Sequence, residues 1–375
     1  MSNGFLSIRR TSLYAFIAYI LFFLANYAYY AVFATDYLNY WIHDNYSDYF
    51  YFPLNLDQGK SYMHHLNGMT DGKFIPLSSA TGIAYIYFFF SYFFIEITAD
   101  NVALISFIFN NIFVIISYLY FVKIGVEVLR LPLRYRWLFF MNPSLIYFSQ
   151  MIQKEMLSLA AVLALTYYIA KTKKFKSILV TGMATIQRIH FFLLTPMAIF
   201  LTNAFGGFWK KVFILYVMTS LGAAYIVNSS NFVNFTGASA DGYSQLILKI
   251  NRGYYIGNLL FNPIKFVQYL YDLFASFNCI TNNLQINLYR VHNIPYLIFL
   301  IFNWKKLCCI VLNYRAILRE PSRTILSVII VYVFMILVAP IVHSRYLFPI
   351  SYLLILLVLY SRRWSKSKHG IRLSD

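Results

Sequence analysis

The sequence predicts an all-α fold, that of a polytopic helical membrane protein with about nine to eleven transmembrane helices. Of its 375 residues, 60% are hydrophobic and only 12% are charged, whereas a soluble domain carries about 25% charged residues. Uncharged runs long enough for the ~20 helical residues that cross a bilayer recur along the chain. Helices pair their own backbone polar groups, which lipid cannot do, so we expect every crossing to be helical.

The predicted spans fall into two groups. The longer runs are residues 11–35, 74–95, 101–122, 212–240 and 324–344. The shorter runs, which we interpret as tilted, broken or half-spanning helices, are residues 137–153, 156–170, 177–187, 189–209, 292–304 and 346–361. The first run follows Arg9 and Arg10 and exceeds the apolar core of a signal peptide, so we interpret it as a retained span.

The charges predict the orientation of these spans. Most of the 31 basic residues lie between hydrophobic runs, chiefly in 123–136, 171–176, 305–323 and the 362–372 tail. The positive-inside rule puts these segments in the cytoplasm, together with both termini. The segment 35–79, which is rich in acidic residues, then forms a large first outer loop. Residues 228–292 form a second outer loop with interfacial helices. No repeat or linker divides the chain, so residues 1–375 are expected to form a single integral membrane domain.

One segment conflicts with this scheme. If residues 74–95 and 101–122 both cross the bilayer fully, the basic segment 123–136 ends on the outer side. One of the two runs would then have to re-enter or lie flat. The sequence leaves the side of residues 123–136 open.

Ionisable groups kept beside apolar runs are costly, so they are candidates for function. A carboxylate there can act as a general base, and arginine presents a fork of donors suited to phosphate oxygens. The alternatives are solvated loops for the acidic clusters, and side chains that extend to the membrane interface for the arginines. The candidate residues are Asp57 and Tyr62 in the first outer loop, Lys154 and Glu155, Arg188 beside His190 at the apex of a short helical hairpin over 177–209, Arg290, and His343 with Arg345.

Other functional classes find no support in the sequence. The basic residues form no aromatic-interleaved stripe, so nucleic acid is not an expected partner. No P-loop, nucleophile elbow or zincin motif is present, and we expect neither a metal nor a cofactor. Cys279, Cys308 and Cys309 are expected to be ordinary membrane cysteines.

The motifs occur in an order that resembles a known class of enzymes. In the first outer loop Asp57, Tyr62, Gly72 and Pro76 follow one another, and Asn142-Pro143 precedes Glu155. The hairpin over 177–209 has a basic apex, and Arg345-Tyr346-Leu-Phe-Pro349 follows near the end. Over residues 50–350 this layout resembles the GT-C class of membrane glycosyltransferases, which use polyprenyl-linked sugars. In size and in its aromatic, Asn-rich character, the chain is most similar to bacterial O-antigen repeat-unit polymerases.

The resemblance implies a glycosyltransferase of lipopolysaccharide O-antigen or other surface polysaccharide biosynthesis. It would join polyprenyl-diphosphate-linked oligosaccharide repeat units on the periplasmic face of the bacterial inner membrane. Asp57 or Glu155 would be the catalytic base, and Tyr62, Lys154, Arg188, Arg290, His343 and Arg345 would bind the substrate. The expected partners are membrane lipid, a flippase and a chain-length co-polymerase. The alternatives are a GT-C enzyme that transfers a single sugar from a polyprenyl phosphate, and a polysaccharide flippase or other secondary transporter.

Overall fold

The structure is a computed structural model of the chain. It describes residues 17, 20, 21, 24, 86, 99–142, 144–149, 154–188, 190–203, 207–229, 243–278, 293–312, 318, 321–338 and 344–368. These residues are almost entirely helical and include no strand, which confirms the predicted all-α class. The first outer loop and nearly all of the first two predicted spans lie outside the described residues.

The chain divides into two compact units. Unit 1 comprises Met1–Phe192 and Asn278–Phe299, and unit 2 comprises Leu193–Phe277 and Leu300–Asp375. Two helices contain a boundary between the units, namely α9 (Phe191–Thr202) and α15 (Ile294–Phe302). The expectation of a single membrane domain stays a prediction.

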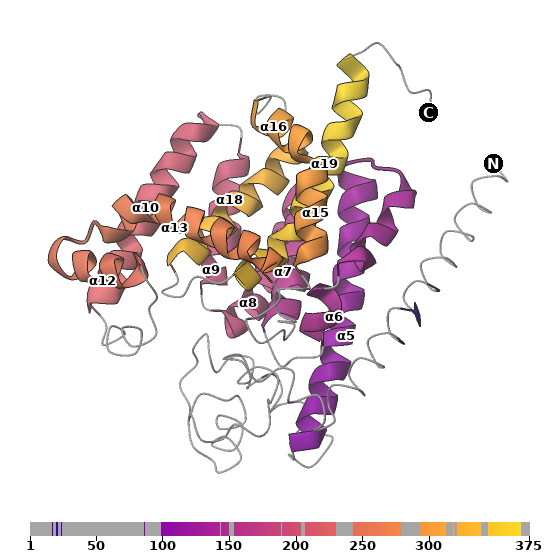
Figure 1. Ribbon diagram of the computed structural model, residues 1–375, viewed down its shortest axis with the longest axis horizontal. Coiled ribbons are helices and arrows are strands. Elements are labelled where there is room, and N and C mark those ends of the chain that lie inside the picture. Colours follow the sequence, from indigo (N-terminus) through magenta and orange to yellow (C-terminus); the bar gives the residue numbers. More distant parts are fainter. Residues whose placement is uncertain are drawn as a thin grey trace. The chain divides into compact units, whose positions relative to one another are not determined.

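Unit 1 is built around two helices that pack along each other, α5 and α7 (Figure 1). Its described elements are α5 (Ala99–Lys123), the π-helical turn η3 (Ile124–Val128), the 3-10 segment η4 (Leu133–Met141), α6 (Ser144–Ser149), α7 (Glu155–Ala170) and α8 (Lys174–Gln187). The predicted run over 137–153 is therefore not one helix. It is divided between η4 and α6, with an extended Asn142 between them.

The path of unit 1 follows from a few contacts along α5. The Tyr118 ring lies 5.7 Å from the ring of Phe139, and Asn110 Nδ2 donates to the Ser149 carbonyl at 3.2 Å. The segment from η4 to α6 therefore runs back along α5. The rings of Tyr120 and Tyr168 lie 5.4 Å apart, so α7 runs parallel to α5. Residues 123–136 and 171–176 thus lie at the same end of unit 1, which the sequence left open.

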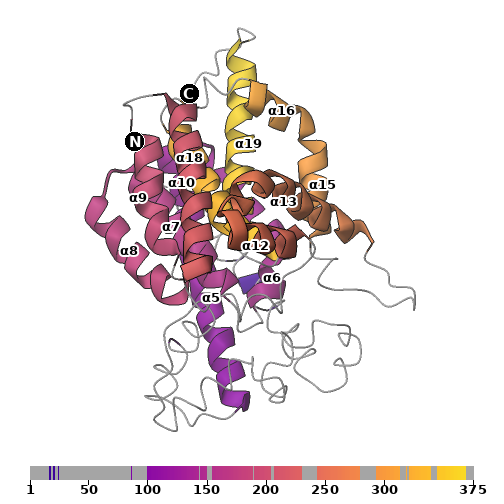
Figure 2. The same cartoon turned by 90° about the vertical axis from the view of Figure 1, so that its left-hand side faces the viewer.

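Unit 2 contains the remaining helices. They are α10 (Phe208–Ser229), α12 (Tyr243–Tyr254), α13 (Gly257–Phe274), η6 (Ala275–Phe277), α16 (Trp304–Leu312), α18 (Ser322–Val338), η7 (Ser344–Leu347) and α19 (Phe348–Lys368). Helix α13 packs against α10, α12, α18 and η7, and Figure 2 shows it beside α10 and α12. Two helices, α12 and α13, lie within 228–292, and their predicted location at a membrane interface stays a prediction.

Two cations close the carboxyl end of α9 in unit 2. The Lys211 ammonium donates to the carbonyls of Phe200 and Asn203 at 3.1 and 2.9 Å. The Arg323 guanidinium donates to the carbonyls of Leu201 and Asn203. The last carbonyls of a helix have no partner within it and carry partial negative charge, so cations stabilise this end. Two short helices, α8 (Lys174–Gln187) and α9, occupy the predicted segment 177–209, and their arrangement as a hairpin stays a prediction.

Helix α13 turns its polar residues inward. Asn258, Asn262 and Lys265 are at most 4% exposed, whereas Leu260 and Val267 are more than half exposed. A surface helix of a water-soluble protein shows the opposite pattern. Across the described residues, many other large apolar side chains are exposed as well, including Phe213, Met218 and Ile226 on α10.

Among the described residues, one helical stretch is long and apolar enough to cross a membrane, Ile108–Val128. Taken alone this is a weak indication, because the core helix of a soluble protein can pass the same test. Shorter apolar helices follow at Glu155–Ala170, Phe191–Thr202, Ser322–Val338 and Phe348–Ser361. The predicted number of crossings stays a prediction.

The junction of α12 and α13 leaves no room for a side chain at Gly257. Asn251 Oδ1 accepts from the Asn258 backbone N–H at 3.1 Å, so it satisfies a donor at the start of α13. A Cβ atom at Gly257 would lie 2.7 Å from this Oδ1 and would also collide with the Ile247 carbonyl. Glycine is therefore needed here for the close approach of two backbones.

We predict that Gly257→Ala destabilises the protein by about 1–3 kcal/mol, because the added methyl overfills a packed junction. Gly253→Ala, four residues earlier at the end of α12, is the matched control, since a Cβ there meets nothing within 4 Å. Alanine also favours helix over glycine, so the control variant should be unchanged or stabilised by up to about 1 kcal/mol. Denaturant titration in detergent micelles measures both, and equal stabilities would contradict the predicted clash.

Candidate functional site

The described part of the chain contains one ion pair that is almost fully buried. Arg188 Nη2 lies 3.2 Å from Glu155 Oε1, and their side chains are 8% and 4% exposed. Glu155 is the first residue of α7, and Arg188 directly follows α8 in extended backbone. The two residues lie 33 positions apart in the sequence. Both residues were candidates from the sequence, but they were not predicted to pair with each other.

The hairpin formed by α7 and α8 brings these residues together. Its turn is closed by hydrogen bonds from the Lys171 and Lys173 N–H groups to the carbonyls of Tyr167 and Tyr168. Thr172 between them has a positive φ of 54°. The helices have similar lengths, 16 and 14 residues. Because they pack side by side in opposite directions, the beginning of α7 meets the end of α8.

The position of Glu155 favours a negative charge there. The first turn of a helix carries unpaired N–H groups and the positive end of the helix dipole, both of which attract a carboxylate. The guanidinium of Arg188 adds a full positive charge at hydrogen-bonding distance. Charge-assisted hydrogen bonds of this kind are about twice as strong as neutral ones. Removing either partner would leave the other charge buried.

Two further ionisable residues lie beside the pair. Lys154 precedes α7, and His190 lies in the turn between α8 and α9. Burial, followed by the positive charges of Arg188 and Lys154, lowers the pKa of His190 to about 3. The imidazole is therefore neutral near pH 7, and the cations of the site are Arg188 and Lys154.

These residues form what we call the Glu155 site, consisting of Lys154, Glu155, Arg188 and His190. A buried carboxylate can accept a proton from a hydroxyl group that binds against it. A guanidinium offers five donors in a planar fork, which matches the oxygens of a phosphate. The set combines a base with groups that stabilise an anion. Among the described residues, no three His, Cys, Asp or Glu side chains gather as metal ligands would.

The other predicted site residues are not brought to this site by the described structure. Asp57, Tyr62, Arg290 and His343 lie outside the described residues. Arg345 lies in η7 of unit 2, and its side chain is not among those described. Their predicted roles stay predictions.

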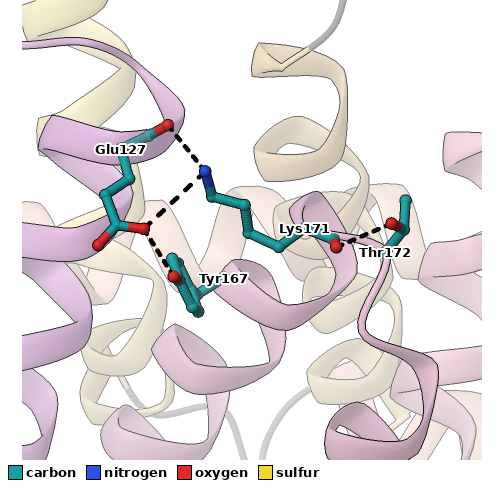
Figure 3. Close-up of polar contacts among 4 residues, drawn as sticks. All are labelled: Glu127, Tyr167, Lys171 and Thr172. Atoms are coloured by element: carbon teal, nitrogen blue, oxygen red, sulfur yellow. Dashed lines mark hydrogen bonds and ion pairs between the residues drawn. The ribbon is translucent and has the colours of Figure 1, made fainter.

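A second acidic cluster lies at the opposite end of α7, and the sequence analysis missed it (Figure 3). Tyr167 donates to Glu127 Oε2 at 2.7 Å, and the Lys171 ammonium donates to the Glu127 carbonyl at 3.2 Å. The side chains of Lys171 and Glu127 are 3.9 Å apart and 35% and 43% exposed. Glu127 is the one acidic residue in the basic segment 123–136, a signal that the sequence did offer. The cluster ties η3 to the end of α7.

No family model, no curated protein and no solved structure matches this chain. Functional inference therefore depends on the residues and their geometry.

We predict strong coupling between Glu155 and Arg188. Glu155→Gln or Arg188→Gln alone should each lower the free energy of unfolding by about 3–5 kcal/mol, because one buried charge loses its partner. The double variant should lose clearly less than the sum of the two. The measurement is a double-mutant cycle from denaturant titrations in detergent micelles.

The half-exposed pair of Glu127 and Lys171 is the matched control for this cycle. Its variants Glu127→Gln and Lys171→Gln should change stability by less than about 1 kcal/mol, since water screens the two charges. Purely additive effects at Glu155 and Arg188 would contradict the buried pair.

His190 should make the protein sensitive to mild acid. Its pKa in the folded state is about 3, below the ~6.5 of an unfolded chain, so acid protonates the unfolded state first. The stability that neutral His190 contributes is present above pH ~6.5 and is lost as the pH falls toward 3. We predict a drop in apparent melting temperature from pH 7 to pH 5 that His190→Gln reduces. An identical drop in both proteins would argue against a buried neutral imidazole.

Proposed function

We propose that the chain is a polytopic membrane protein. The support is the stretch Ile108–Val128 together with the inverted pattern of burial, in which apolar side chains face outward and asparagine, serine and lysine face inward. In water such a surface would be an aggregation hazard, whereas in lipid it is the expected one. Trp209 and Tyr254, both at least half exposed, lie near helix ends, as aromatic residues do at membrane interfaces.

The charges of unit 1 favour one orientation. The basic segments 123–136 and 171–176 gather at one end of α7, and the Glu155 site lies at the other. A helix of 16 residues is about 24 Å long, close to the ~30 Å of a hydrocarbon core. With the basic end in the cytoplasm, the Glu155 site lies near the outer face. In a bacterium this is the periplasmic side of the inner membrane.

We infer that the protein is a glycosyltransferase of the GT-C type, and we propose that it is an O-antigen or surface polysaccharide polymerase. The observation that carries the proposal is the buried pair of Glu155 and Arg188 beside Lys154. A polymerase that uses a polyprenyl-diphosphate donor needs a base for the acceptor hydroxyl and cations for the leaving diphosphate. The Glu155 site holds both kinds of group within one hairpin.

In the proposed reaction, an acceptor sugar hydroxyl attacks the anomeric carbon of the lipid-linked donor. The new bond joins that carbon to the acceptor oxygen, and the bond from the carbon to the diphosphate oxygen breaks. The diphosphate leaves with the bonding electron pair, which Arg188 and Lys154 stabilise. Glu155 takes the proton of the acceptor hydroxyl. Asp57 is the alternative base, because the resemblance of the first outer loop points to it.

The ion pair also offers a way to keep the base inactive until substrate binds. In the described structure Arg188 contacts Glu155. A diphosphate carries more negative charge than a carboxylate and accepts bidentate hydrogen bonds from arginine. When it binds Arg188, Glu155 would lose part of its ion pair and become free to accept a proton.

The test is the chain length of the surface polysaccharide in cells that lack this protein and are complemented with single variants. Glu155→Gln should reduce the polysaccharide ladder to single repeat units, with a loss of chain growth of about 10²- to 10⁴-fold, as expected when a general base is removed. Arg188→Lys should weaken chain growth less, because it keeps the charge but not the fork of donors.

Glu127→Gln is the matched control, since it removes a carboxylate at the other end of α7 and should leave the ladder unchanged. Membrane levels of each variant are compared by immunoblot. A truncated repeat unit in the cells without the protein would indicate a single-sugar transferase instead. Unchanged glycans in those cells would exclude both enzymes.

A further inference from the structure

Unit 1 carries a strongly basic surface that the proposed reaction does not use. The segments 123–136 and 171–176 contain eight basic residues and one acidic residue, Glu127. Six of the basic side chains are exposed. We call these six residues the basic surface, which consists of Lys123, Arg130, Arg134, Lys173, Lys174 and Lys176.

Contacts between the ends of α5 and α7 bring the two segments together. The ammonium of Lys123 lies 5.4 Å from the ring centroid of Tyr120 on α5 and 5.7 Å from that of Tyr167 on α7. The Lys171 ammonium donates to the Glu127 carbonyl at 3.2 Å, so the turn after α7 contacts η3 (Figure 3). The fold therefore assembles the basic surface from two segments that lie far apart in the sequence.

Hydrogen bonds fix the backbone that carries these cations. After η3, the Leu131 N–H donates to a carbonyl of η3 at 2.7 Å, and after α7 the Lys173 N–H donates to a carbonyl of α7 at 2.9 Å. Arg130 and Thr172, which lie in these two turns, both have a φ of 54°, a left-handed conformation that is uncommon for such residues. The backbone positions of the cations are therefore set before a partner binds, which lowers the cost of ordering on binding.

Folding alone does not favour this concentration of positive charge. Like charges repel one another, and Glu127 is the one carboxylate in the two segments. Lys173, Lys174 and Lys176 also lie at the start of α8, where the positive end of the helix dipole disfavours cations. Negative charge supplied by a binding partner would offset both effects.

Apolar side chains next to the basic surface indicate the kind of partner. Phe175, which lies between two of its lysines, is 72% exposed, and Ile178 and Leu179 on the next turn of α8 are 62% and 53% exposed. Trp137, three residues after Arg134, is 50% exposed. A soluble anion would bind the cations but would leave these apolar side chains in water. The boundary between lipid headgroups and acyl chains accommodates both kinds of side chain.

We propose that the basic surface binds the headgroups of anionic phospholipids. Phosphate oxygens accept hydrogen bonds from its lysine and arginine side chains, and the neighbouring exposed aromatic and aliphatic side chains contact the acyl chains. The proposal rests on the proposed membrane location, in which the basic end of unit 1 lies at the cytoplasmic leaflet. The site is contained within unit 1.

The experiment uses the full-length protein in an uncharged detergent, with phosphatidylglycerol as the anionic probe. The measurement is the shift in apparent melting temperature as the lipid is titrated, at ~0.05 M and at ~0.5 M salt. The comparison ligands are phosphatidylcholine, which has a phosphate but no net charge, and inorganic phosphate, which has no acyl chains. The double variant is Lys173→Gln with Lys174→Gln. Its matched control is Lys249→Gln with Arg252→Gln on α12 of unit 2, which also removes two exposed cations.

We expect the Lys173 and Lys174 double variant to be as stable as the wild type or more stable without lipid, because it removes cations from a helix start. Its apparent affinity for phosphatidylglycerol should fall about ten- to thirtyfold, since each basic residue at an anionic lipid surface contributes about fivefold. The α12 control should bind the lipid as the wild type does. High salt should weaken the response of the wild type. Phosphatidylcholine and inorganic phosphate should each give a much smaller shift.

Several results would overturn the proposal. A Lys173 and Lys174 double variant that responds to phosphatidylglycerol as the wild type does would mean that the lipid binds elsewhere. An equal loss in the α12 control would mean that only the net charge of the protein matters. An equal response to phosphatidylcholine would make the effect one of acyl chains, and an equal response to inorganic phosphate would make the ligand a soluble anion. The polysaccharide ladder of Glu155→Gln is measured independently, so the reaction and the lipid site can fail separately.

Discussion

Polar groups at the helix ends of these units find partners on neighbouring helices, while many large apolar side chains face outward. The end of α9 shows how this is achieved. Its last carbonyls accept hydrogen bonds from Lys211 and Arg323, which come from two other helices. The start of α13 uses the Asn251 side chain in the same way. Helix ends are thus closed by side chains from neighbouring helices, and the same contacts hold the helices together.

The charged residues of the two units differ in how deeply they are buried, and therefore in how much their desolvation costs. Glu127 and Lys171 remain partly exposed, and the contact joins two chain segments at modest cost. Glu155 and Arg188 are both buried, so they pay desolvation that an apolar pair would avoid. Lys265 is buried on α13, as are Asn258 and Asn262. Residues that cost stability without being needed for packing are the ones from which function is best argued.

Among the described residues, the sequence predicted the helices α5, α10 and α18, whose apolar runs are long. The helices α8 and α9 were recognisable because two short apolar runs flank Arg188 between two basic clusters. The partner of Glu155 was not predictable, because it depends on the matched lengths of α7 and α8. The burial of the Lys265 side chain could not be predicted from the sequence either. The pattern of α13 shows an apolar and a polar face, but which face is buried depends on whether lipid or water surrounds the helix.

The position of Glu155 at the beginning of α7 has a consequence for its chemistry. A helix start favours negative charge, so the carboxylate would stay favourably placed if Arg188 turned toward a substrate anion, as the proposed mechanism requires. A base in mid-helix would lose its only electrostatic support at that moment and would become a buried, uncompensated charge. In the proposed mechanism, Arg188 would contact first the carboxylate and then the ligand, while the unpaired N–H groups at the start of α7 stabilise the carboxylate throughout.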